Sequence, residues 1–430
     1  VQTGSSGGTQ IILPKTVSYQ AHADRTKSAD DVEIKLTKSA ITRLSTNLPA
    51  AYNYKELGET WSAPRIFRLP NSGAGDNQIE DDIYVAVMGG GYGGRDDKVG
   101  SALFVINLED SATPGKVEKV IEVEDYNSIN IVNSVPGTPV VVTPDLARGI
   151  KFKGALVYVN DFEGKISKFN LTNMSDDGQG NSIKLYDSTV LLSIDANKKN
   201  GRYQFHAMDA GVGQTTKQLW LFSGTGDYER LTSKDSSIDN LMYGFRDKAY
   251  PLFKQTRDEL SVLYGLKPCI DTTGDTQGYK CPVTTKEYDR ISRKKKDNGW
   301  YIKLKNSQKV TAEPTVSNGL VYFPIFEPSQ SANKCSLGLA LICAVNDECG
   351  TNVSDQLGSL KDQKIDGKTY AGRTCYAVGQ GVLSRLVVFA KKLFANIAGK
   401  SVQNKTDLVV IDSGMADLDT FRNSWREGNF

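Results

Sequence analysis

The chain has 430 residues, of which 39% are hydrophobic and 24% are charged, as in a soluble globular protein with a substantial core. The chain has 52 Lys and Arg residues and 50 Asp and Glu residues, which gives a net charge of +2. This balance does not indicate a protein that binds polyanions over its whole surface. No apolar run approaches the roughly 20 residues that a membrane-spanning helix needs, so we expect no transmembrane segment in this chain.

The N-terminal stretch differs in composition from the rest of the chain. It begins VQTGSSGGTQ, which is polar, rich in Gly and Ser, and typical of a linker or of the trimmed end of a longer protein. We therefore assign residues 1–50 to an N-terminal linker and first strands, and residues 51–430 to one large domain. Residues 32–48 are a candidate for an additional repeat of that domain.

A group of short strands recurs along residues 51–430. Each group combines a β-rich run, a turn rich in Gly, Asp or Asn, and an apolar run that ends in a polar side chain, and three groups also begin with a Pro-led strand. The Pro-led strands lie at residues 64–66, 139–141 and 314–316. The β-rich runs lie at residues 83–88, 156–159, 219–222, 320–323 and 393–395. The closing runs lie at residues 103–107, 166–170, 242–247, 342–346 and 408–412.

Five such units in series, without a sustained helical period, predict an all-β fold of the β-propeller type. The units are unevenly spaced, so we expect a modified propeller with long loop insertions, above all at residues 227–239 and 252–298. The last strand and residues 32–48 are candidates for further blades. A pair of packed sheets, a β-sandwich, is the alternative fold.

Six cysteines lie in the second half of the chain: Cys269, Cys281, Cys335, Cys343, Cys349 and Cys375. The first two bracket a turn-rich segment and are candidates for a local disulfide, and the other four allow three connectivities. A zinc site is disfavoured, because no two cysteines have C-x-x-C spacing and the chain has only two histidines. Disulfides point to an oxidising compartment such as the periplasm or the cell surface.

A Gly-rich segment, Gly-Gly-Gly-Tyr-Gly-Gly at residues 89–94, is a candidate phosphate-binding loop. A phosphate loop needs Gly-Lys-Ser/Thr or Gly-x-Gly-x-x-Gly at the start of a helix. Here a predicted strand follows at residues 101–107. We therefore interpret the segment as a turn within a blade.

His206, Asp209 and Ser223 are the residue types of a catalytic triad. The Ser lacks the Gly-x-Ser-x-Gly context of a nucleophile elbow, because Phe-Ser-Gly-Thr-Gly surrounds it. We therefore predict that His206 is a structural histidine with its hydrogen bonds satisfied, and we predict no catalytic residues and no metal ligands.

A run of basic residues lies in the second long insertion, just before Asp297. Such a run is usually a solvated loop, but it is also the candidate contact for DNA or another anionic partner. Its members are Arg290, Arg293, Lys294, Lys295 and Lys296.

Several motifs, taken in order, resemble the C-terminal domain of the PilY/PilC family of type IV pilus tip-associated biogenesis and adhesion factors. They are LGETWSAP at residues 57–64, YVNDFEGKISKFNL at 158–171, FSGTGDY at 222–228 with YGFRD at 243–247, and GWYIKL at 299–304, followed by Pro-Thr-Val at 314–316 and Val-Tyr-Phe at 321–323. The resemblance runs from Leu57 to the C-terminus.

The resemblance implies a modified β-propeller at the pilus tip or outer membrane of a Gram-negative bacterium. The implied role is non-enzymatic: promotion of pilus extension, surface adhesion and twitching, with DNA uptake as a further role. The implied partners are minor pilins of the pilus tip complex, a host or abiotic surface, and DNA. The alternatives are a pure surface adhesin without an assembly role, and a quinoprotein-like propeller dehydrogenase. The dehydrogenase is disfavoured, because the chain has only four Trp residues and no regular Trp in each blade.

Many members of that family carry a calcium loop, D-x-D-x-D-x-x-x-D, directly before the strand that contains Tyr158 here. Calcium needs six to eight oxygen ligands, and therefore several carboxylates. The matching residues 143–154 offer one acid, Asp145, together with the basic residues Arg148, Lys151 and Lys153. We therefore predict no calcium at this loop and no cofactor.

Overall fold

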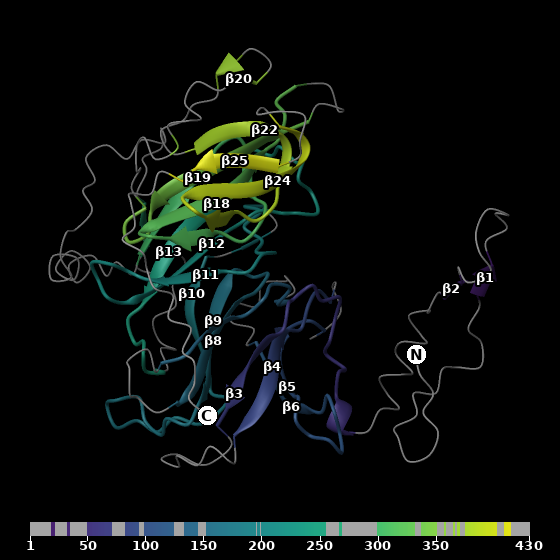
Figure 1. Cartoon of the computed structure of the whole chain (residues 1–430), viewed down its shortest axis with the longest axis vertical. Coiled ribbons are helices and arrows are strands. Elements are labelled where there is room, and N and C mark those ends of the chain that lie inside the picture. Colours follow the sequence, from purple (N-terminus) through teal and green to yellow (C-terminus); the bar gives the residue numbers. More distant parts are fainter. Residues whose placement is uncertain are drawn as a thin grey trace.

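The structure is a computed structural model of the whole chain (Figure 1). It describes residues 19–21, 32–34, 50–70, 82–93, 99–123, 133–144, 152–194, 196–197, 199–254, 266–268, 299–331, 337–350, 357, 364–365, 368–369, 375–401 and 408–413. In these ranges the chain is almost entirely β, with one helical turn, η1 (Ala50–Tyr52). Strand β1 (Tyr19–Ala21) pairs with β2 (Val32–Ile34) in a separate sheet, so residues 32–34 join none of the larger sheets.

The first two blades are four-stranded antiparallel sheets in which each strand pairs with the next in sequence. Blade 1 contains β3 (Arg65–Leu69), β4 (Ile83–Gly89), β5 (Ala102–Asn107) and β6 (Val117–Glu122). Blade 2 contains β7 (Val140–Val142), β8 (Gly154–Asn160), β9 (Lys165–Thr172) and β10 (Ser188–Ser193).

Blades 3, 4 and 5 carry additional short strands and connections. Blade 3 contains β11 (Asp209–Val212), β12 (Leu219–Gly224), β13 (Leu241–Asp247) and β15 (Gly299–Lys303), with β14 (Leu266–Pro268) parallel to β15 at its edge. Blade 4 contains β17 (Thr315–Ser317), β18 (Leu320–Glu327), β19 (Leu339–Asn346) and β22 (Cys375–Leu383), and β16 (Lys309–Val310) pairs with the far end of β18. Blade 5 contains β23 (Val387–Phe389), β24 (Lys392–Ser401) and β25 (Leu408–Asp412). The two-residue strands β20 (Lys364–Ile365) and β21 (Lys368–Thr369) pair with each other.

Blades 4 and 5 are joined into one continuous sheet. The first part of β22, from Cys375 to Gln380, pairs with β19, and its last part, from Gly379 to Leu383, pairs with the end of β24. The start of β24 pairs with β23 and β25 instead. A tight turn at Ala390 and Lys391, with φ of 48° and 62°, connects β23 to β24, and two positive φ values are the geometry of a type I′ hairpin.

The core explains why the middle strands of the blades are apolar without alternation. Successive side chains of a strand point to opposite faces of its sheet. In β8, Ala155, Val157 and Val159 pack in a core shared with blade 1, whereas Leu156 and Tyr158 pack in a core shared with blade 3. Both faces of this strand are therefore buried.

The same rule continues through the later blades. In β12, Leu221 faces blade 2 and Trp220 faces blade 4. In β18, Phe323 faces blade 3 and Tyr322 faces blade 5. Within the described residues, each core is thus shared by two blades that follow one another in the chain. This serial stacking of five blades confirms the propeller prediction and rules out the β-sandwich.

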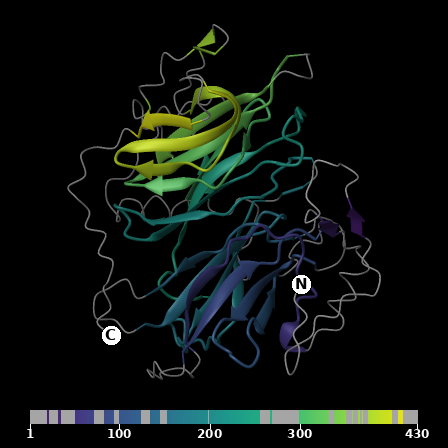
Figure 2. The ribbon, with the colours of Figure 1, turned by 45° about the vertical axis from the view of Figure 1, so that its right-hand side comes forward.

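The two terminal blades lie at opposite ends of the molecule, as Figures 1 and 2 both show. Their outward faces carry exposed apolar side chains, among them Ile66 and Tyr84 on blade 1 and Val387 and Phe389 on blade 5. Phe389 is 70% exposed.

Candidate functional site

One end of blades 1 to 3 brings distant segments together. The Gly-rich turn after β4 forms isolated bridges from Tyr92 to Glu59 and from Gly91 to Val135. The β8–β9 turn contacts the same region, because the amide of Phe162 donates to the carbonyl of Ser134 at 3.0 Å. Turns from two blades and the segments that lead into them therefore meet at this end.

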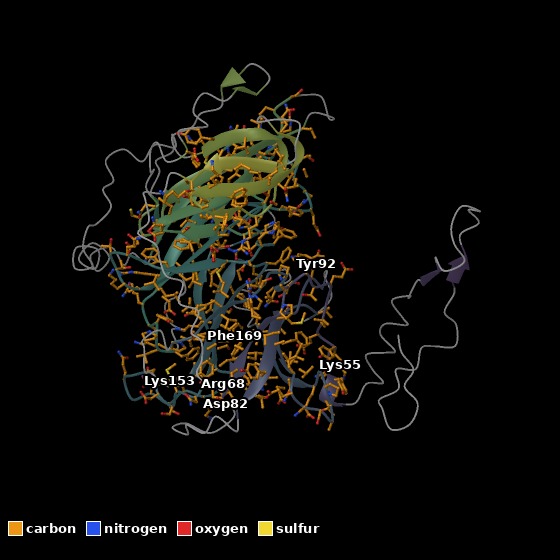
Figure 3. All side chains as sticks on the ribbon, in the orientation of Figure 1. Lys55, Arg68, Asp82, Tyr92, Lys153 and Phe169 are labelled. Carbon is orange, nitrogen blue, oxygen red and sulfur yellow. A yellow bond between two sulfur atoms is a disulfide. The ribbon has the colours of Figure 1, made fainter. Side chains whose placement is uncertain are left out.

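Aromatic side chains occupy this end, and we call them the aromatic face: Trp61, Tyr92, Phe162, Tyr203, Phe205, His206 and Tyr228. Phe162 lies at the centre, with ring centroids 4.4 Å from Phe205 and 5.3 Å from Tyr92. Tyr228 packs edge-on against His206 at 5.2 Å. Figure 3 shows Tyr92 at one end of blade 1, with Arg68 and Asp82 near the other.

Two members of the aromatic face are open to solvent. Trp61 is 52% exposed and Tyr228 is 43% exposed, whereas Phe162 and Phe205 are buried behind them. The indole Nε1 of Trp61 donates to the carbonyl of Phe205 at 3.4 Å. Tyr228 is thus supported by packed aromatic rings, and Trp61 by a hydrogen bond to the backbone of Phe205.

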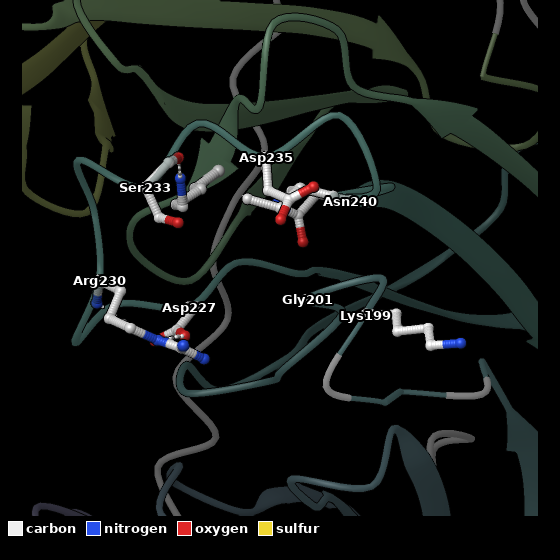
Figure 4. A pocket seen from close by; sticks show the side chains of 9 residues that line it. Lys199, Gly201, Asp227, Arg230, Ser233, Asp235 and Asn240 are labelled. Atoms are coloured by element: carbon white, nitrogen blue, oxygen red, sulfur yellow. Dashed lines mark hydrogen bonds and ion pairs between the residues drawn. The ribbon is translucent and has the colours of Figure 1, made fainter.

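A small cavity of about 70 Å³ is lined by Asp227, the residue before Tyr228, and we call it the polar pocket (Figure 4). It is formed by the loop between β12 and β13 and by the segments that contact that loop. Asp227 and Arg230 lie side by side in Figure 4, joined by a 2.7 Å ion pair. The lining residues are Lys199, Gly201, Asp227, Arg230, Ser233, Asp235, Ile238, Asn240 and Lys309.

Lys309 holds the loop that forms the polar pocket. Its buried ammonium group donates to the backbone carbonyls of Leu231, Ser233 and Ser307 at 3.0, 2.9 and 3.1 Å. Burial lowers the pKa of Lys309 to about 8, and the nearby carboxylate of Asp227 opposes that shift. The predicted insertion at residues 227–239 is therefore an ordered loop wrapped around one ammonium group.

The three residue types of a triad are not brought together. The carboxylate of Asp209 accepts the amide of Val316 at 2.8 Å, which joins blade 3 to blade 4. His206 Nε2 has no hydrogen-bond partner among the described residues, so it is bonded to neither Asp209 nor Ser223. Burial lowers the pKa of His206 to about 4, which keeps the imidazole neutral.

His206 therefore takes part in no Ser-His-Asp hydrogen-bond chain within the described residues, and that it is a structural histidine stays a prediction. Its ring packs on Tyr228, and its Nε2 has no partner within the described ranges. Edge-to-face contact with an aromatic ring stabilises a neutral imidazole without a hydrogen bond.

The cysteine prediction is resolved in part. Cys343 and Cys375 lie opposite each other in β19 and β22 and form a disulfide. Cys349 is disulfide-bonded as well. Cys269, Cys281 and Cys335 lie outside the described residues, so the local pairing of the first two stays a prediction.

Other predicted site residues also lie outside the described ranges. They are the basic run of Arg290, Arg293, Lys294, Lys295 and Lys296, and the calcium-loop position Asp145. In the part of the chain that the structure covers, no three His, Cys, Asp or Glu residues are arranged to hold a metal ion. The same part contains no helix long and apolar enough to cross a membrane.

The Gly-rich segment is a blade turn, as predicted, because it connects β4 directly to β5. Its backbone passes so close to its surroundings that a Cβ at Gly93 would lie 1.8 Å from the carbonyl oxygen of Val99. Close approach of two backbones, and not a phosphate, accounts for that glycine.

Buried ion pairs, one between blades and one within a blade turn, are the features that sequence reasoning missed. Lys168 and Asp247 form a 2.6 Å ion pair between blades 2 and 3. Lys165 forms a 2.9 Å ion pair with Glu163 in the β8–β9 turn. The only sequence signal was the motif resemblance, which covers all four residues without assigning them a role.

No family model matches the chain, and a search of curated proteins finds no relative. The fold is similar to that of the C-terminal domain of PilY1 from Pseudomonas aeruginosa. That similarity covers 84% of this chain and 74% of the PilY1 domain, with a TM-score of 0.53 and 14% sequence identity. At that identity PilY1 establishes the fold, a β-propeller, and nothing further.

Two other propellers align more weakly than PilY1. BamB from Moraxella catarrhalis aligns over 81% of this chain and 95% of its own length, with 11% identity and a TM-score of 0.21. The PQQ-bound aldose sugar dehydrogenase from Streptomyces coelicolor aligns over 81% of this chain and 85% of its own, with 10% identity and a TM-score of 0.27. Both TM-scores are too low to bear on the fold or the function.

Proposed function

We propose that the chain is a non-enzymatic type IV pilus tip or assembly factor that promotes pilus extension, surface adhesion and twitching, and takes part in DNA uptake. The observation that carries this proposal is the fold shared with the PilY1 domain over 84% of the chain. Fold alone does not define function, so the family-like motifs add the necessary second support.

Those motifs coincide with contacts that hold the propeller together. The hydroxyl of Tyr158 donates to Asp247 at 2.8 Å, from blade 2 to blade 3. The indole of Trp300 donates to the carbonyl of Asp347 at 2.7 Å, from blade 3 to blade 4. The motifs follow one another in the sequence because each contributes contacts between one blade and the next.

The Cys343–Cys375 disulfide supports an extracytoplasmic location, at the cell surface, pilus tip or outer membrane. The proposed partners there are minor pilins, a host or abiotic surface, and DNA. Purified minor pilins should therefore be retained by the immobilised protein, and failure to retain any of them would count against the assembly role.

Deletion in the producing cell tests the function directly. Loss of surface pili and of twitching, restored by the wild-type gene, is the expected result. Normal pili with reduced attachment would replace the proposal with a pure adhesin. Turnover of an alcohol or aldose with pyrroloquinoline quinone and an electron-accepting dye would replace it with the dehydrogenase.

A further inference from the structure

We propose that the aromatic face and the adjoining polar pocket form a binding site for a neutral carbohydrate. This inference rests on the proposed function for its biological role, because it names the class of surface ligand that adhesion would use. Its physical argument rests on the site alone.

The exposed rings provide a platform of the kind that a sugar ring can cover. Trp61 and Tyr228 flank Phe205, the first through a hydrogen bond to its carbonyl and the second with ring centroids 6.4 Å apart. Large rigid rings give contact area at little cost in side-chain entropy, and the C–H face of a pyranose presents an apolar surface of matching size. The packed layer behind Tyr228 and the hydrogen bond from Trp61 restrain the two rings before any ligand binds.

The pocket provides polar groups beside that platform. Asp227 lines the pocket and Tyr228 follows it directly in the loop, so one loop carries both a pocket residue and a ring of the platform. A cavity needs roughly 10–15 Å³ to hold one water molecule, so about 70 Å³ has room for several hydroxyl groups. Asp227 and Arg230 are paired with each other, but a carboxylate has about four acceptor sites and a guanidinium five N–H donors, so both keep capacity for a ligand hydroxyl.

The mixture of charges selects a neutral ligand. A phosphate or sulfate in the pocket would face the carboxylates of Asp227 and Asp235, and a cation would face Lys199, Arg230 and Lys309. A hydroxyl group both donates and accepts, so a polyol can use both kinds of group.

A protein partner fits the site less well. A stable protein interface buries about 800 Å² on each partner, which two half-exposed rings beside a small pocket do not supply. We therefore expect a mono- or oligosaccharide ligand.

Calorimetric titration of the whole purified chain tests the proposal. The probes are four neutral sugars (methyl α-mannoside, lactose, cellobiose and diacetylchitobiose) and two charged ones (sialyllactose and a sulfated oligosaccharide). We expect at least one neutral sugar to bind, and Trp61→Ala and Tyr228→Ala each to weaken that binding by about tenfold or more.

Two variants separate stacking from folding. Trp61→Phe keeps an aromatic ring and should retain most of the affinity. Tyr84→Ala removes a ring that is equally exposed, at 49%, on the outward face of blade 1, and should change nothing. Thermal unfolding of each variant measures any folding defect independently.

Binding of no neutral sugar, or wild-type affinity in both Trp61→Ala and Tyr228→Ala, would overturn the inference. Tighter binding of the charged sugars than of every neutral one would overturn the ligand class. These titrations use the isolated chain, so a negative result would not contradict the proposed pilus role. A deletion strain with normal pili and twitching would likewise not contradict sugar binding.

Discussion

Lys168 and Asp247 form an ion pair across the interface of two blades, with the ammonium nitrogen 2.6 Å from Oδ2 of the carboxylate. Both side chains are buried, and the hydroxyl of Tyr158 donates to the same oxygen. Lys168 also donates to the carbonyl of Leu252 at 2.7 Å. Burial lowers the pKa of Lys168, although the adjacent carboxylate of Asp247 opposes that shift.

Removal of one partner of this pair should destabilise the protein strongly. Lys168→Met leaves the Asp247 carboxylate in a buried interface without its counter-ion, which costs about 3–5 kcal/mol of unfolding free energy. Urea denaturation measures the loss. The double variant Lys168→Met/Asp247→Asn should recover part of it, because the buried charge is gone.

An exposed lysine provides the matched control for that experiment. Lys184→Met removes a solvent-exposed ammonium group and should stay within about 0.5 kcal/mol of the wild type. If Lys168→Met were as stable as this control, the buried pair would contribute nothing to blade stacking.

Asp347 should make stability depend on pH. Burial, with the nearby Glu348 as a second cause, raises the pKa of Asp347 to about 6 from 3.8. A carboxyl whose pKa is raised in the folded state favours folding when protonated, so its contribution is full below about pH 4 and is lost as the pH rises through 6. Asp347→Asn should therefore stabilise the protein at neutral pH by up to about 3 kcal/mol, since one pKa unit corresponds to about 1.4 kcal/mol.

The measurement is the unfolding free energy of the wild type and Asp347→Asn at several values between pH 4 and 8. The unfolding free energy of the variant should fall less steeply than that of the wild type as the pH rises over this range. Asp412→Asn, at an exposed position, should reproduce the wild-type curve. An unchanged slope in Asp347→Asn would show that another group titrates.

The Cys343–Cys375 disulfide should stabilise the protein measurably. It closes a loop of 32 residues, for which the chain-entropy account gives about 3–4 kcal/mol. The pair of substitutions Cys343→Ala and Cys375→Ala should lose that amount in non-reducing urea titration. Peptide mapping that linked Cys343 to any other cysteine would refute the pairing.

The basic run should govern any contact with DNA. Neutral substitutions at Arg290, Arg293, Lys294, Lys295 and Lys296 should weaken binding to duplex DNA and flatten its salt dependence, by about 0.9 in the log–log slope for each phosphate that the protein no longer neutralises. Filter binding at several salt concentrations measures the slope. Neutral substitutions at the exposed residues Lys119, Lys184, Lys217 and Lys305 serve as the control, and equal effects in both sets would exclude a specific site.

The blades were predictable from the sequence because their middle strands are marked locally. Runs such as Leu-Val-Tyr-Val-Asn in β8 are apolar on both faces and end at turn residues, so they can be recognised without knowledge of their neighbours. The joining of blades 4 and 5 was not predictable. It depends on β22 changing partners midway from β19 to β24, and pairing is a tertiary property.

Most of the candidate site could not be predicted from the sequence either, because it also depends on tertiary contacts. Trp61 and Tyr228 belong to separate motifs, and only the stacking of three blades brings them to one face. Lys309 lies 76 residues from Ser233, whose carbonyl it holds, so no local pattern links them. Local patterns identified the units, whereas the contacts between units required the structure.

The serial order of the cores has a consequence for how the molecule opens. Each described hydrophobic core is shared by two blades that follow one another, so we expect cooperativity to pass mainly from neighbour to neighbour, as in a linear array of repeats. Blades 1 and 5 have a single described neighbour each. We therefore expect hydrogen exchange to be fastest in β3 and β25, slower in blades 2 and 4, and slowest in β12 and β13, with fraying that begins at both ends of the array.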